Sequence, residues 1–174
     1  MNLVCLNDLF RHMEWADAEV WRAVFARDEA INDQRLRDIF YHLHLVQHAH
    51  LQAWQGITMQ TPFPTFDDTR AVWAWGRTCY HLIFDYLKQL SEGELEKSFQ
   101  LPWTELVTKQ LGQAPAAVTL GEMMMQAPLH SLYHRGQINM RLREVGGEPP
   151  AVDYIVWRWL GKPNAVWEQN HDGG

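Results

Sequence analysis

The stretch from Thr119 to Gly147, TLGEMMMQAPLHSLYHRGQINMRLREVGG, decides the fold because it reads as a complete helix with both of its ends. Its first residues, Thr119-Leu-Gly-Glu122, match a capping box, in which the two side chains satisfy backbone N–H groups at a helix start. Its last residues are Gly146-Gly147, a common way for a helix to end, and two prolines follow. We therefore expect a helix over residues 119–145.

Three more amphipathic helices precede it. Apolar residues at steps of three and four predict a helix over residues 6–25. A second helix is expected over residues 33–55, capped by Asn32 or Asp33. A third is expected over residues 67–90, because Asp67 and Asp68 are acidic residues of the kind favoured at the positive N-terminus of a helix.

The region between the third and fourth helices, residues 91–118, is the least regular. Its segments 98–101 and 105–108 alternate weakly between apolar and polar residues, which predicts a short hairpin. A tail from Ala151 to Gly174 is expected to pack across the helices. We interpret the whole chain, residues 1–174, as one all-α domain, a four-helix bundle, in which the long link before the last helix leaves room for a crossover.

The composition narrows the class of protein. The chain has 174 residues, a formal net charge of −6 and no long basic run, which argues against nucleic-acid binding. No apolar run reaches the length that a membrane span needs, and no signal peptide is recognised. The two cysteines, Cys5 and Cys79, form no metal-binding or disulfide framework, which fits the reducing cytoplasm.

Two histidines stand four residues apart in the predicted fourth helix, at His130 and His134. Residues at this spacing lie on one helix face, about one turn apart, so that two imidazoles can bind one metal ion. The same spacing is also common on a solvated polar face. A third ligand could come from the segment 41–50, which holds four histidines.

A helical projection separates these four histidines of the second helix. His50 falls inside the apolar arc and His42 on its flank, whereas His44 and His48 fall mostly outside it and are expected to be exposed. His42 and His50 are eight residues apart, about 12 Å along the axis, so they cannot easily bind the same ion. Either could be the third ligand.

Two of these stretches resemble motifs of the DinB superfamily. The segment HLHLVQHAHL, residues 42–51, resembles its second-helix motif, in which a ligand histidine precedes a polar residue by five and a bulky aromatic residue by eight. His42 then takes the ligand position, while His50 replaces the aromatic residue. The segment HSLYHRGQI, residues 130–138, is similar to the fourth-helix signature HxxxHRGQ with its two ligands. The likeness covers nearly the whole chain.

The resemblance implies a four-helix bundle with an open three-histidine site for a divalent metal, usually zinc or nickel, held by His42, His130 and His134. It also implies a possible homodimer. Some relatives are thiol transferases that join a low-molecular-weight thiol to an electrophile. A metal with three imidazole ligands and an open position can ionise a bound thiol or water near neutral pH.

We therefore expect a metal-dependent thiol transferase or hydrolase acting on a small molecule, with neither nucleic acid nor membrane as a partner. The alternative is a metal- or ligand-binding stress-response protein without catalysis. A fourth protein ligand would favour a structural role. The third possibility is that no metal binds and the histidines form a polar seam.

Several other side chains are predicted to act on or near the site, or to be structural. Residues that could orient the imidazoles are Asp8, Glu14, Asp17, Gln126 and Gln137. Arg135 could meet a substrate carboxylate, but a surface salt bridge is the preferred interpretation. His12 is expected to be packed or capping, and His81 to be a hydrogen-bonded core residue. Tyr133 is expected to point away from the two histidines.

Overall fold

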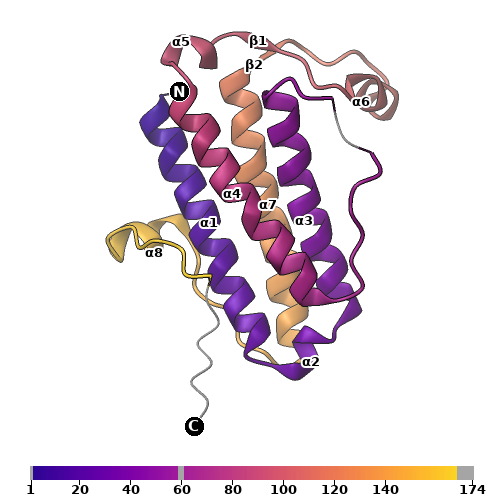
Figure 1. Ribbon diagram of the computed structural model, residues 1–174, viewed down its shortest axis with the longest axis vertical. Coiled ribbons are helices and arrows are strands. Elements are labelled where there is room, and N and C mark those ends of the chain that lie inside the picture. Colours follow the sequence, from indigo (N-terminus) through magenta and orange to yellow (C-terminus); the bar gives the residue numbers. More distant parts are fainter. Residues whose placement is uncertain (1, 59–60, 168–174) are drawn as a thin grey trace.

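Four long helices lie side by side in the computed structural model, which describes residues 2–58 and 61–167 (Figure 1). They are α1 (Leu3–Phe25), α3 (Gln34–Trp54), α4 (Thr69–Gln89) and α7 (Leu120–Glu144). The short helices are α2 (Asp28–Ile31), α5 (Glu92–Leu95), α6 (Thr104–Leu111) and α8 (Tyr154–Trp159). The two short strands β1 (Ser98–Phe99) and β2 (Val118–Thr119) pair antiparallel. The described chain is thus all-α apart from this small ribbon, as predicted.

Side-chain caps set the starts of the long helices close to where the sequence places them. Asp33 accepts a hydrogen bond from the backbone N–H of Leu36, and Asp68 accepts one from Ala71. Thr119 and Glu122 form the predicted capping box at the start of α7. α1 begins at Leu3, three residues earlier than expected, because Asn2 caps it through the N–H of Cys5.

The connections differ from the expectation in two ways. The predicted hairpin between residues 98–101 and 105–108 is wrong, because β1 pairs with β2 and residues 105–108 lie inside α6. The link from α4 to α7 stays at one end of the helices and carries β1, α6 and β2 (Figure 1). The segment from α3 to α4 instead returns along the length of the molecule, so α3 and α4 run in the same direction (Figure 1).

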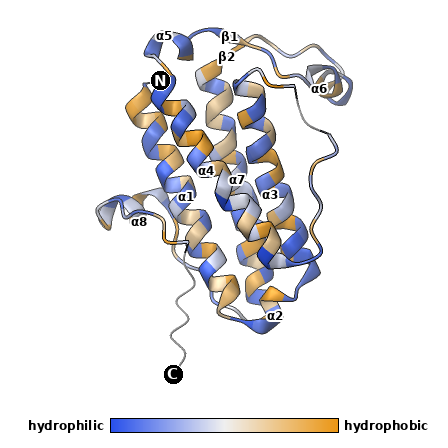
Figure 2. Cartoon of the chain, viewed as in Figure 1, coloured by the Kyte–Doolittle hydropathy of each residue, from blue (hydrophilic) through white to orange (hydrophobic). Residues whose placement is uncertain are grey.

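Hydrophobic and hydrophilic residues alternate around each long helix, so that each helix has an apolar face to bury (Figure 2). The buried apolar side chains form two clusters. One contains Trp21, Phe40, Ile138 and Trp157, and the other contains Phe10, Trp54, Ile83 and Met124. A set of buried side chains from all four long helices is joined by hydrogen bonds between their polar atoms. They are Asp17, His44, Gln47, Tyr80, Ser131 and Arg135, and we call them the polar layer.

The tail after α7 packs against α1. Trp157 of α8 is fully buried, and its indole N–H donates to the carbonyl oxygen of Pro163 at 3.0 Å. The ring of His12 donates from Nε2 to the carbonyl oxygen of Val152 at 2.8 Å, which confirms a packed role for this histidine. Residues 168–174 of the predicted tail lie outside the described part of the chain.

Candidate metal centre

The structure brings three of the predicted site residues together. His42 of α3 meets His130 and His134 of α7, and potential ligand atoms of the three side chains all lie within 4.8 Å of one another. The ring centroid of His42 is 4.7 Å from that of His134 and 5.4 Å from that of His130. We call these three residues the histidine cluster. His42 is exposed, while the two α7 histidines are half-buried.

Gln137, one of the predicted orienting residues, fixes one ring of the cluster. Its side-chain oxygen lies 2.8 Å from Nδ1 of His134. An amide oxygen only accepts, so Nδ1 of His134 carries the proton and, in the neutral ring, Nε2 presents its lone pair to the cluster. Nε2 of His130 lies 3.1 Å from that atom. Two α7 nitrogens therefore face the same point.

Burial favours the neutral form of the other two rings. Desolvation lowers the pKa of His130 to about 4, helped by the charges of His134, His42 and His50. Desolvation, followed by the charge of His134, also lowers the pKa of His42. Both rings are thus neutral near pH 7, which is the form that offers a lone pair to a metal ion.

This donor set fits a divalent cation of the zinc or nickel type. Imidazole nitrogens that share one tetrahedral zinc ion lie roughly 3.3 Å apart, given zinc–nitrogen bonds of about 2.0–2.1 Å. The 3.1 Å pair on α7 is already near that separation, and the exposed ring of His42 has room to close on it. Nδ1 of His130 is buried without a hydrogen-bond partner. Within the described residues, no fourth histidine, cysteine or carboxylate belongs to the group.

His50, the other candidate for the helix-two ligand, lies outside the cluster. Its Nδ1 donates to the carbonyl oxygen of Val46 at 2.9 Å, and its ring meets the edge of Trp103, with centroids 5.4 Å apart. Of the two alternatives that the sequence leaves open, the structure therefore places His42 with His130 and His134.

The expectation that His44 and His48 are exposed is wrong. His44 is fully buried and His48 is 9% exposed. The apolar arc of the helical projection marks the side of α3 that faces apolar side chains, but α4 covers a second side of the same helix. There Gly76 lets the two helices approach, since a Cβ atom at this position would lie 2.3 Å from the ring of His44. The ring of His48 stacks on Trp75.

Arg135 is also not on the surface. It is 2% exposed, and its guanidinium donates to Oδ1 of Asp17 at 2.6 Å. Arg135 thus forms a salt bridge, but the preferred interpretation that this salt bridge lies on the surface is wrong. No local pattern could pair these residues, which stand 118 positions apart in the chain.

Gln47 joins the rest of the polar layer. Its side-chain nitrogen, with two protons to donate, lies within 3.1 Å of oxygen atoms of Asp17, Tyr80 and Ser131, and its oxygen accepts from Nδ1 of His44 at 2.9 Å. Nε2 of His44 accepts in turn from the indole N–H of Trp21 at 3.0 Å. Tyr80 donates its hydroxyl proton to Asp17, and burial beside this carboxylate raises the pKa of the phenol. Sequence reasoning missed this role of Gln47, although a glutamine within an apolar stretch was a signal for it.

The other predicted orienting residues lie elsewhere. Asp8 pairs with Arg158 and Lys162, Glu14 accepts from the indole of Trp167, and Gln126 is exposed. Tyr133 is exposed, with its ring edge-on to that of His134.

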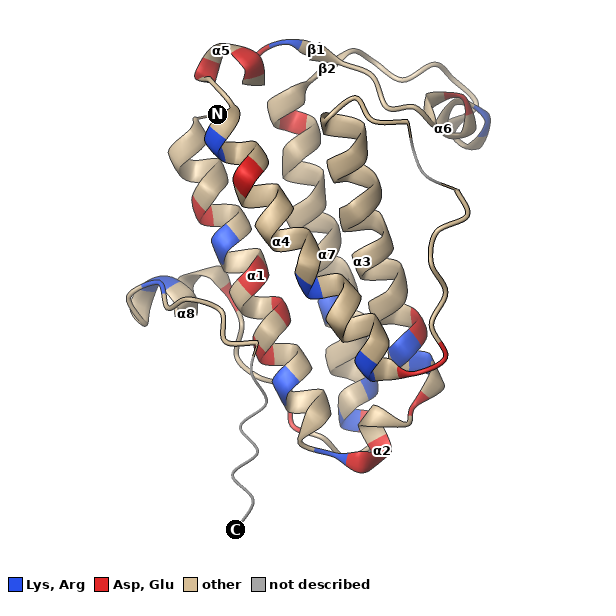
Figure 3. Cartoon of the chain, viewed as in Figure 1, with Lys and Arg blue, Asp and Glu red and all other residues tan. Residues whose placement is uncertain are grey.

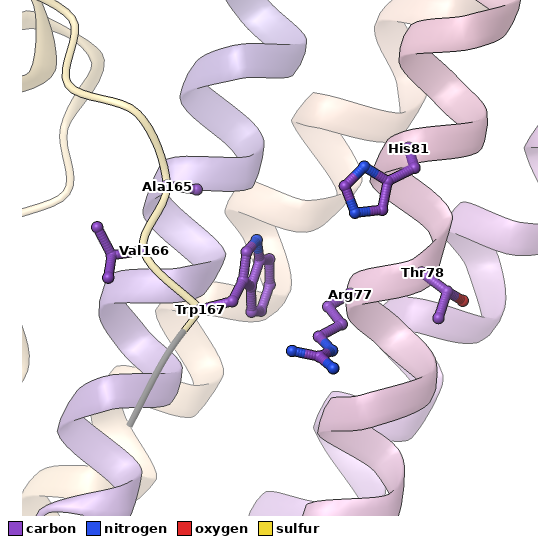
Figure 4. A pocket seen from close by; sticks show the side chains of 6 residues that line it. All are labelled: Arg77, Thr78, His81, Ala165, Val166 and Trp167. Atoms are coloured by element: carbon purple, nitrogen blue, oxygen red, sulfur yellow. The ribbon is translucent and has the colours of Figure 1, made fainter. Parts of the chain in front are cut away.

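His81 is exposed rather than in the core, so that expectation is wrong. It lines a surface cavity of about 600 Å³ between α4 and the segment 165–167, together with Arg77 and Trp167 (Figure 4). No member of the histidine cluster is among the residues that line this cavity.

The arrangement defines a helical protein with a three-histidine cluster open to one side. The chain belongs to the DinB family, whose model matches residues 3–165. Neither a curated protein nor a solved structure matches the chain. No helix in the described parts of the chain is long and apolar enough to cross a membrane. Acidic and basic residues are interspersed over the part of the chain drawn in colour (Figure 3).

Proposed function

We propose that this protein is a divalent-metal-dependent enzyme built on a four-helix bundle, with His42, His130 and His134 as metal ligands. Its reaction is a thiol-dependent S-transfer or a hydrolysis of a small molecule. The observation that carries the proposal is the meeting of three imidazoles from α3 and α7 with no fourth ligand-type residue among the described ones. Three protein ligands and an open position are the pattern of catalytic rather than structural zinc.

The chain's own residues prepare the site for such chemistry. Gln137 holds His134 in the tautomer whose Nε2 points into the cluster. Burial keeps His130 and His42 neutral near pH 7. A bound zinc or nickel ion would supply a Lewis acid that makes a thiol or a water molecule acidic enough to ionise near neutral pH. In S-transfer, the thiolate sulfur would form a new bond to an electrophilic carbon while the bond from that carbon to its leaving group breaks. The leaving group would depart with the bonding electron pair, and the thiol proton would pass to solvent.

Elemental analysis of protein purified without a histidine tag tests the site. We expect about one equivalent of a divalent metal in the wild type and most of it lost in His134→Ala. His81→Ala is the matched control, because this histidine is exposed and outside the cluster. Equal metal content in both variants, or no metal after reconstitution with Zn²⁺ and Ni²⁺, would sink the assignment.

The metal-loaded protein then separates the reaction classes. Loss of free thiol in the presence of an electrophile, dependent on His134, supports S-transfer, whereas acid release from esters or amides without thiol supports hydrolysis. If the protein binds metal but turns over neither thiol with electrophile nor esters and amides, the alternative of a non-catalytic metal-binding protein is favoured.

A further inference from the structure

A cavity of about 410 Å³ lies under the segment that joins α4 to α7. β1, α6 and β2 form this segment, residues 98–119, which we call the cap (Figure 1). Side chains of the cap, among them Phe99, Leu101, Val107 and Val118, line the cavity together with Met123 of α7. The volume lies in the range of pockets that hold small molecules.

The lining of the cavity is chemically uniform. None of its residues is charged, and its few polar members are Ser98, Gln100 and Thr104. An apolar lining gains free energy when an alkyl or aryl group leaves water to fill it. A charged group would lose its hydration there without finding a partner. The cavity therefore selects an uncharged, apolar group.

α6 covers this space rather than packing into the protein core. None of its residues is buried, and Leu106, on the side away from the cavity, is 67% exposed. Val107 lines the cavity and is only half-buried. Apolar atoms that face a void lack packing partners, so a ligand in the cavity would supply contacts that the cap does not make by itself.

Both helices that carry the histidine cluster lead to the cap. On α7, Met123 precedes His130 by seven residues, close to two full turns, so both lie on the same face about 10 Å apart along the axis. On α3, His50 follows His42 by eight residues, about 12 Å along the axis. The ring of His50 contacts Trp103, which sits in the cap between the lining residues Leu101 and Thr104.

We propose that the cavity under the cap binds the apolar part of the substrate, an alkyl or aryl group, while the reactive group of the same molecule meets the histidine cluster. This inference rests on the proposed function and specifies its substrate class. The substrate is then elongated, with a metal-directed polar end and an apolar end separated by a span on the order of 10 Å.

A series of n-alkyl hydroxamates, from propyl to decyl, tests the inference by calorimetry on the zinc-loaded protein. The hydroxamate group chelates zinc, and the chain reports on the cavity. Once the chain is long enough to enter the cavity, each added methylene should tighten binding by up to about fourfold. We expect the decyl compound to bind at least about tenfold tighter than the propyl compound.

Two neighbouring residues of α6 give a matched pair of variants. Val107→Asp places a charge in the cavity, whereas Leu106→Asp places it on the exposed side of the same helix. The dependence on chain length should vanish in Val107→Asp and persist in Leu106→Asp, and propyl binding should be unchanged in Leu106→Asp. Ala117→Trp, which fills the cavity without adding a charge, should act like Val107→Asp.

The outcomes separate the two proposals. Equal affinities for propyl and decyl hydroxamates in the wild type would overturn the cavity assignment and leave the metal site standing. A dependence on chain length that survives in Val107→Asp and Ala117→Trp would overturn it too. If the propyl compound binds His134→Ala as well as the wild type, the proposed function itself fails. In that case, binding of decanol, which has no chelating group, would show that the cavity is an apolar binding site that does not act together with the cluster.

Discussion

His42 and His44 stand two residues apart on α3, yet they belong to opposite kinds of polar site. His44, in the polar layer, has both ring nitrogens hydrogen-bonded, one to Gln47 and one to Trp21. His42, in the histidine cluster, is exposed and faces two other imidazoles. Both sites join α3 to α7, but the polar layer is buried and its hydrogen bonds link all four long helices, whereas the cluster is exposed at His42.

The contrast teaches where a ligand can act. A histidine whose two nitrogens already hold protein partners would have to break them to bind a metal, at a cost of buried unsatisfied groups. Nδ1 of His130 has no partner at all. On α7 the two functions alternate, because Ser131 and Arg135 directly follow His130 and His134 and point to the core instead.

The largest effect should come from breaking the polar layer at Asp17. In Asp17→Ala the buried guanidinium of Arg135 loses its charge partner, and Tyr80 and Gln47 lose an acceptor. We expect a loss of about 3–5 kcal/mol in the free energy of unfolding, measured by urea denaturation. The matched variant Asp85→Ala breaks the exposed pair with Lys88 and should leave the free energy of unfolding nearly unchanged, because solvent screens such a pair. Similar small losses in both variants would contradict a stabilising role of the polar layer.

A buried histidine that belongs to neither site extends the comparison to pH. Burial lowers the pKa of His48 from the usual 6.5 of a histidine to about 4. As the pH is lowered, His48 therefore becomes protonated in the unfolded chain before it does so in the folded chain. The free energy of unfolding thus falls as the pH drops from about 6.5 towards 4. His48→Phe keeps an aromatic ring on Trp75 but has no group to protonate. We expect it to reduce the acid-induced loss in the free energy of unfolding by about 2–3 kcal/mol.

Thermal unfolding at several pH values in this window measures the difference. His81→Phe is the control, since the exposed His81 is not buried by folding. If His48→Phe loses as much stability at acidic pH as the wild type, groups other than His48 cause that loss.

The cluster should respond to the loss of a hydrogen bond in metal affinity rather than in stability. Gln137→Ala removes the acceptor that orients His134. We expect metal affinity to fall about 10–100-fold, measured by competition with a chelator. Gln126→Ala, at an exposed glutamine of the same helix, should leave the affinity within about twofold. An equal effect of both variants would remove Gln137 from the site.

The smallest effects concern two glycines with opposite surroundings. A Cβ atom at Gly76 would lie 2.3 Å from the ring of His44, so Gly76→Ala should destabilise the protein by about 1–3 kcal/mol. Gly136, on the exposed side of α7, has no atom within 4 Å of such a Cβ. Gly136→Ala should raise the stability by roughly 0.5–1 kcal/mol. Thermal melts of the two variants that shift in the same direction would contradict the close approach of α3 and α4.

The sequence predicted the long helices and their caps because those signals are local. Thr119 with Glu122, Asp33 and Asp68 each stand beside the N–H groups that they satisfy. It also predicted His130 and His134 on one face, since four-residue spacing is a property of a single helix. Which α3 histidine meets them depends on how two helices pack, and the choice between His42 and His50 had to come from the structure.

The failures have the same cause. His44 and Arg135 appeared to face solvent because their partners, Trp21 and Asp17, belong to another helix. A helical projection identifies the buried face of one helix from its apolar residues. It therefore misses a polar side chain that is buried against polar side chains of other helices. Likewise, β1 finds its partner in β2 across α6, rather than in the nearer segment 105–108.

The hydrogen bonding of the polar layer has a consequence for how the protein matures. Its bonds between Asp17, Gln47, His44 and Arg135 involve no member of the histidine cluster. A metal ion at the proposed site would therefore add to a core that other bonds hold together, unlike the ion of a small domain whose metal supplies its stability. Which ion such a site would take depends on what the cell supplies, because imidazoles accept several divalent metals.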